Sequence, residues 1–121
     1  MSISNEGPVG TLERVGIDVA DMDQAARFWE GLLGVKVANR GDKHLMFERQ
    51  GDGPSLYVQE VPEKKTAKTR LHFDIAVENL DTTVARSVVL GAKQAQSYAE
   101  GGRGHVVMED PDGNEFCLTL M

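Results

Sequence analysis

The sequence contains a single cysteine, Cys117, so it cannot form an internal disulfide bond or a zinc finger. Scarce cysteine is typical of proteins in a reducing compartment, and we expect a cytoplasmic protein. No run of about 18 apolar residues exists, which excludes a membrane-spanning helix. Residues 1–10 also lack the basic start and the apolar core of a signal peptide.

Basic residues are scarce as well. The chain has 13 Lys and Arg against 19 Asp and Glu, and its formal net charge is −6. Nucleic-acid binding depends largely on Lys and Arg that neutralise phosphates, and anionic membranes attract basic surfaces. We therefore expect neither nucleic acid nor membrane as a partner. A length of 121 residues, 40% of them hydrophobic, is typical of one soluble domain, and we assign residues 1–121 to it.

Apolar and polar residues alternate in two stretches, residues 13–20 and 71–77. Such alternation predicts strands with one apolar and one polar face. Asp21 and Asn79 follow these stretches and can each cap a helix N-terminus. The second helix is expected over residues 80–90, with an apolar side formed by Leu80, Val84 and Val88.

The first helix is expected to begin after Asp21 and to end at Gly34. Its apolar residues recur on one side, which favours packing against a sheet. We expect Trp29 to be buried against the sheet of the first half. The apolar side consists of Ala25, Phe28, Trp29, Leu32 and Leu33.

Three further strands are expected in each half of the chain, and similar residues recur about 58 positions apart. The predicted fold is α+β: two tandem βαβββ modules that form a curved mixed sheet with a concave cavity. Module one spans about residues 11–61 and module two about 70–121. The linker, residues 62–69, is charged and is expected to be a solvated loop. The further strands are expected at residues 35–39, 44–49, 55–60, 93–98, 104–109 and 115–120.

The polar faces of the two first strands are too polar for a dry core, so they face water or a partly enclosed site. The repeat makes Arg14 equivalent to His72. If the modules pair by pseudo-symmetry, both side chains face one cavity, where Asp18 and Asp74 could balance or orient them. The last strand of each module adds side chains to that face. The expected cavity residues are Arg14, Asp18, Tyr57, Gln59, His72, Asp74, Glu115 and Cys117.

Two motifs carry a family resemblance. Residues 15–21, followed by 26–34, resemble the opening of the vicinal oxygen chelate superfamily, and residues 110–118 resemble its closing motif. That superfamily contains glyoxalase I, the bleomycin-resistance proteins and the extradiol dioxygenases. Residues 58–63 and 70–74 are most similar to its glyoxalase-like domain branch. The resemblance covers residues 11–121 and implies a homodimer, in which a partner chain helps to build the cavity.

Enzymes of this superfamily hold a divalent metal with His, Gln or Glu from the first and last strands of the modules. His72 matches one of these ligand positions. The other positions fall at Arg14, at Tyr57 or Gln59, and at Cys117. A guanidinium stays protonated and cannot ligate a metal, so the resemblance implies an incomplete ligand set. It leaves open whether a divalent metal binds and assigns no catalytic residue.

Three functions remain as hypotheses. The first is a small-molecule-binding protein of the bleomycin-resistance type, which holds its ligand in the concave cavity. The second is a metal-dependent glyoxalase-like lyase or isomerase, with His72 as ligand or as acid–base group. In this case Arg14 could bind a carboxylate or phosphate of an anionic substrate. The third is a non-catalytic interaction module with a vestigial cavity.

Overall fold

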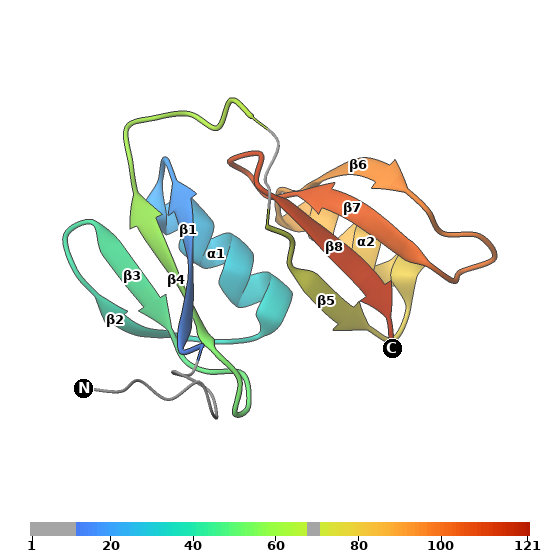
Figure 1. Cartoon of the computed structure of the whole chain (residues 1–121), viewed down its shortest axis with the longest axis horizontal. Helices are drawn as coiled ribbons and strands as arrows, with labels where there is room; N and C mark the ends of the chain where they lie inside the picture. Colours follow the sequence, from blue (N-terminus) through green and yellow to red (C-terminus); the bar gives the residue numbers. More distant parts are fainter. Residues whose placement is uncertain (1–11, 68–70) are drawn as a thin grey trace, which may run out of the picture.

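The structure is a computed structural model that describes residues 12–67 and 71–121. A strand, a helix and three strands follow one another twice along the chain (Figure 1), which confirms the predicted α+β fold of two βαβββ modules. The elements of module one are β1 (Arg14–Val19), α1 (Met22–Leu33), β2 (Val37–Arg40), β3 (His44–Phe47) and β4 (Ser55–Glu60). Those of module two are β5 (Asp74–Val77), α2 (Leu80–Leu90), β6 (Lys93–Ser97), β7 (His105–Glu109) and β8 (Glu115–Leu120).

The strands form two four-stranded mixed sheets, in the orders β1-β4-β3-β2 and β5-β8-β7-β6. In each sheet the first strand runs parallel to the last strand of its module, and the other pairs are antiparallel. The predicted mixed sheet is thus divided into two. β1 and β5 each form an edge of their own sheet, on the inner sides of the molecule (Figure 1).

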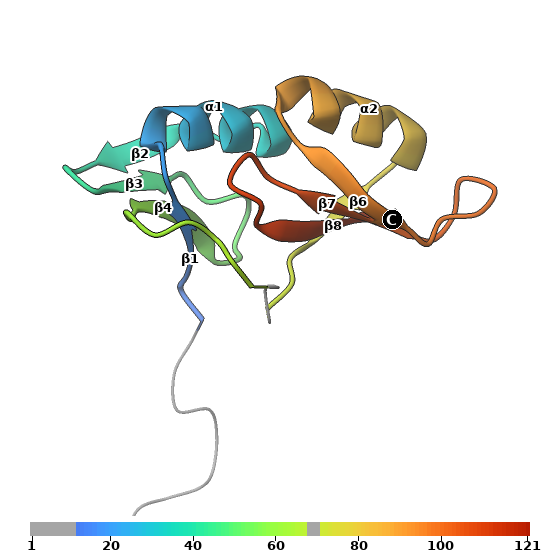
Figure 2. The ribbon, with the colours of Figure 1, turned by 90° about the horizontal axis from the view of Figure 1, so that it is seen from above.

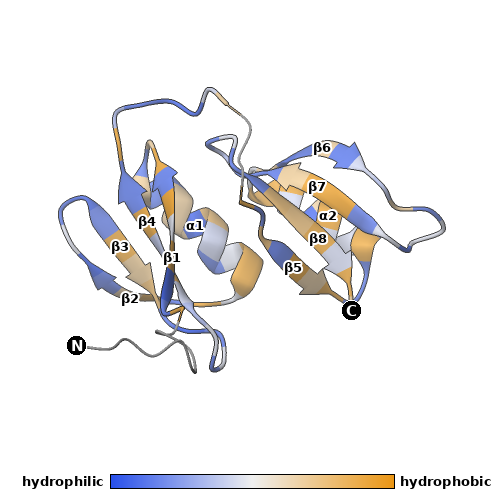
Figure 3. Ribbon diagram, viewed as in Figure 1, coloured by the Kyte–Doolittle hydropathy of each residue, from blue (hydrophilic) through white to orange (hydrophobic). Residues whose placement is uncertain are grey.

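Both helices lie on the same side of the two sheets and contact each other (Figure 2). Asp21 caps α1 by accepting hydrogen bonds from the backbone N–H groups of Asp23 and Gln24. Gly34 ends this helix in the left-handed region, with φ of 69°. Hydrophobic residues are concentrated in β3, β7 and β8, whereas β6 is hydrophilic (Figure 3). Among the described residues, no helix is long and apolar enough to cross a membrane.

Four aromatic rings join the two modules. Trp29 of α1 is 1% exposed, and its ring centroid lies 5.1 Å from Phe28, 5.5 Å from Phe116 and 6.5 Å from Phe73. Phe116 and Phe73 belong to module two, so Trp29 packs at the junction of the modules and not only against the first sheet. The buried hydrophobic residues of both modules form one cluster. Neither module buries this surface alone.

The apolar side of α2 differs from the prediction at one position. Leu80 is buried and Val84 is partly buried, as expected, but Val88 is 49% exposed. Ser87 is fully buried in its place, and its hydroxyl donates a hydrogen bond to the carbonyl of Thr83 at 2.7 Å. This bond within the helix satisfies the hydroxyl, so its burial costs little.

The turn between β7 and β8 ties module two to the end of β1. The Asn114 side-chain amide donates to the carbonyl of Asp18 at 3.0 Å, and the backbone N–H of Ala20 donates to the Asp112 carboxylate at 2.8 Å. Lys65 of the linker forms an ion pair with Glu115 at 3.2 Å. The side chain of Lys65 is only 21% exposed, so the prediction of a solvated loop is wrong at this residue. Residues 68 and 69 of the predicted linker lie outside the described residues.

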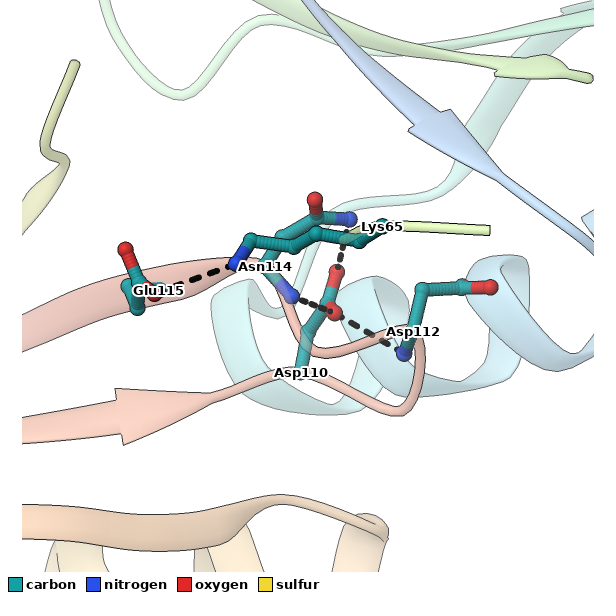
Figure 4. A network of polar contacts seen from close by, with 5 residues as sticks. All are labelled: Lys65, Asp110, Asp112, Asn114 and Glu115. Atoms are coloured by element: carbon teal, nitrogen blue, oxygen red, sulfur yellow. Dashed lines mark hydrogen bonds and ion pairs between the residues drawn. The ribbon is translucent and has the colours of Figure 1, made fainter. Parts of the chain in front are cut away.

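Asp110 organises this turn from a buried position (Figure 4). Its carboxylate accepts hydrogen bonds from the backbone N–H groups of Asp112 at 2.9 Å and Asn114 at 2.8 Å, and from the Asn114 amide at 3.2 Å. Burial raises the pKa of Asp110 to about 6, and the hydrogen bonds offset part of that effect. An acidic group with a shifted pKa therefore lies at the junction of the modules.

Candidate functional site

The face of the first sheet opposite the helices carries the predicted polar residues. Ile17 and Val19 are buried, whereas Arg14, Gly16 and Asp18 are exposed. This pattern agrees with the alternation in the sequence. On the neighbouring strand, Ser55, Tyr57 and Gln59 lie beside Arg14, Gly16 and Asp18, in that order. Residues in register on adjacent strands point to the same face, so these six residues, five of them with side chains, share one surface.

Tyr57 lies across β1 at the position of Gly16. A Cβ atom at Gly16 would overlap the ring carbons and the hydroxyl of Tyr57. The missing side chain therefore lets the Tyr57 ring settle over the neighbouring strand, with its hydroxyl above the backbone of β1. This arrangement fixes an aromatic ring in the middle of the polar face.

A cavity of about 380 Å³ adjoins this ring. Arg14 and Tyr57 line it together with His44, Leu45 and Met46 of β3. The His44 and Tyr57 ring centroids are 6.4 Å apart, and His44 is the ladder partner of Gln59. Three polar side chains from three different strands thus border one hollow.

His72 and Asp74 line a different cavity, of about 420 Å³, between the two modules. Trp29, Gln50 and Ser55 also contribute to it. The strand predicted over residues 71–77 begins only at Asp74, so His72 precedes β5. Asp74 lies next to Cys117 in the ladder, and the Cys117 side chain is 7% exposed.

The other predicted cavity residues lie near the module junction. Asp18 lines a third cavity, of about 780 Å³, together with Lys65, Asp112 and Asn114. The Glu115 side chain is largely buried and forms an ion pair with Lys65. The predicted residues therefore border at least three hollows. Arg14 and His72, expected to face one cavity, line two different ones because β1 and β5 do not pair with each other.

His44 is exposed and is not one of the cavity residues expected from the sequence. The structure places it beside Arg14 and Tyr57. The signal was present in the alternation of β3, where Leu45 and Phe47 are buried and His44 and Met46 point to the opposite face. Aligning β3 with β4 as a hairpin would have placed His44 on the polar face.

The described residues do not fit a metal site. Within residues 12–67 and 71–121, no three His, Cys, Asp or Glu side chains are grouped so that they could hold a metal ion. Arg14, which takes the position equivalent to His72 in module one, carries a guanidinium and cannot ligate a metal.

The sequence profile described as "Glyoxalase-like domain" matches residues 14–119. The chain belongs to this family. The match spans both modules and confirms the resemblance that the opening and closing motifs indicated. A search of curated proteins found no match to this glyoxalase-like chain.

Solved structures share the fold of this glyoxalase-like domain. A glyoxalase/bleomycin resistance protein/dioxygenase family enzyme from Burkholderia phytofirmans PsJN is 15% identical, with a TM-score of 0.76 over 92% of this chain and 98% of that chain. Glyoxalase I of Leishmania major is 20% identical, with a TM-score of 0.73 over 92% of this chain and 86% of that one. A fosfomycin resistance protein from Mesorhizobium loti is 19% identical, with a TM-score of 0.72 over 93% and 92%. At such identities the likeness concerns the fold alone.

Proposed function

We propose that this glyoxalase-like protein binds a small organic molecule on the sheet faces opposite the helices. The observation that carries the proposal is Tyr57, whose ring lies across Gly16 between the polar side chains of three strands. Binding sites commonly combine an apolar surface with a few converging polar groups. The helices cover only the other side of each sheet, so this face is accessible to a ligand (Figure 2).

The test is a thermal-shift screen of organic anions, cations and neutral compounds, followed by calorimetric titration of the compounds that raise Tm. A ligand that binds the folded state stabilises it by mass action. We expect Tyr57→Ala to weaken binding at least tenfold. Val89→Ala, a substitution on the exposed side of α2, should leave the Kd unchanged. Equal binding by both variants, or no binding compound in the whole screen, would contradict the proposal.

A metal-dependent lyase or isomerase is the second candidate. His72 favours it, because this exposed imidazole matches a ligand position of the superfamily and borders a cavity with Asp74. The test is the metal content of the purified protein and its melting with Ni²⁺, Zn²⁺, Mn²⁺ and Fe²⁺. Bound metal that is lost in His72→Ala would support an enzyme, and unchanged melting with all four ions would speak against it.

The proposal includes a homodimer and a cytoplasmic location. β1 and β5 present open edges, so a second chain could pair along them and help to enclose the cavity on the face without helices. We expect sedimentation at micromolar concentration to give about twice the chain mass of 13.2 kDa. A species of 13.2 kDa under these conditions would contradict the dimer. A single buried cysteine suits a reducing compartment.

A further inference from the structure

Hydrogen-bond donors from three strands border the cavity beside Tyr57. Arg14 belongs to β1, His44 to β3 and Tyr57 to β4. A guanidinium offers donors only, a phenol offers one, and an imidazole offers at least one. No Asp or Glu lines this cavity. The described lining of this hollow is therefore suited to an acceptor group.

The charge balance around Arg14 favours an anion. Arg14 lies 3.8 Å from Glu13, but Glu13 also lies 3.6 Å from Arg49. One carboxylate shared by two guanidinium groups leaves about one positive charge in excess at this end of β1. The Arg14 side chain is 49% exposed, so a ligand from solvent can contact its guanidinium.

The same cavity has an apolar part. Met46 contributes to its lining, and the Tyr57 ring is held in place over Gly16. Methionine and aromatic side chains make favourable contacts with flat apolar groups. The cavity of about 380 Å³ is at the small end of ligand sites. A ligand that fits both parts has a compact apolar body and one charged acceptor group.

We propose that Arg14, Tyr57 and His44 form an oxyanion subsite, which binds the carboxylate or phosphonate of a small organic anion while its apolar body lies on Met46 and the Tyr57 ring. Arginine is suited to this role because its planar donors match the geometry of a carboxylate or phosphonate. This inference rests on the proposed function and specifies the chemical class of the ligand.

The test uses phenylphosphonate, benzoate and the neutral benzamide as probes, with Kd values from NMR titration of the full chain. We expect phenylphosphonate or benzoate to bind at least tenfold more tightly than benzamide, and the preferred anion distinguishes a phosphonate site from a carboxylate site. Arg14→Met should raise the Kd of the preferred anion at least tenfold. Arg49→Met is the matched control, since it removes the same charge and the same Glu13 contact but does not line the cavity. Its Kd should rise by no more than about threefold, because Arg49 contributes only a screened, solvent-exposed charge outside the cavity.

Tyr57→Phe removes only the hydroxyl and keeps the ring over Gly16. It should weaken the preferred anion severalfold and leave benzamide unaffected, which separates the subsite from a loss of folding. Equal losses of affinity in Arg14→Met and Arg49→Met would overturn the subsite. So would benzamide that binds as tightly as both anions, or a failure of both anions to bind. If compounds from the screen still depend on Tyr57 while the anions fail, the oxyanion subsite is wrong and the small-molecule function stands.

Discussion

Replacing Trp29 by alanine should lower the free energy of unfolding by about 3–5 kcal/mol, the range typical of aromatic-to-alanine changes in a core. Trp29 is 1% exposed and packs against aromatic rings from both modules. The substitution therefore opens a cavity at the junction of the modules and not in one of them. Urea unfolding followed by circular dichroism measures the loss.

Two further variants test the reason for this loss. Trp29→Phe keeps an aromatic ring and removes the indole N–H, which is buried and has no hydrogen-bond partner among the described residues. It should cost much less than alanine, since a buried unpaired donor is itself unfavourable. Val89→Ala, at a side chain that is 87% exposed, should change stability by no more than about 0.5 kcal/mol. If Trp29→Ala unfolds like Val89→Ala, the junction does not hold the modules together.

The second large effect concerns pH. The pKa of Asp110 in the folded protein is about 6, above its ordinary value of 3.8. The folded state therefore holds this proton more tightly than the unfolded state does. The stability contributed by the protonated group is complete below pH 4 and is lost as the pH rises to about 6 and beyond. A shift of this size corresponds to about 3 kcal/mol.

Asp110→Asn removes the ionisation and keeps an oxygen that can accept the two backbone hydrogen bonds of the turn. Between pH 4 and pH 7, its unfolding free energy should fall by about 2 kcal/mol less than that of the parent. Asp52→Asn, at an exposed position in the turn before β4, should keep the parental pH profile. Identical profiles for the parent and Asp110→Asn would show that burial does not control this carboxyl group.

Local signals in the sequence account for most of the elements. β4 and β8 have the predicted bounds, and α2 covers residues 80–90 as expected. Alternation, capping side chains and turn glycines act within a few residues, so a sequence records them directly. The aromatic contact between Trp29 and Phe116 is different, because it joins residues far apart in the chain. No periodicity in the sequence indicates which module an apolar helix face will meet.

The candidate site was predictable in its residues but not in their grouping. Arg14, Tyr57 and Gln59 lie on the predicted face, yet His72 precedes its strand and borders another cavity. The repeat implied that Arg14 and His72 are equivalent, but equivalence in sequence does not make two edge strands pair. His44 joined the group only when the hairpin register of β3 and β4 was known. Spatial neighbours on a sheet depend on register, which the repeat alone does not fix.

The most direct test of ligand binding at the Tyr57 face is amide chemical-shift mapping of the full chain with the tightest compound from the screen. We predict that the largest shifts occur in β1, β3 and β4, around Gly16, His44 and Tyr57, and that they disappear in Tyr57→Ala. Shifts centred on the helices, or shifts that persist unchanged in Tyr57→Ala, would contradict the assignment of this face as the ligand site.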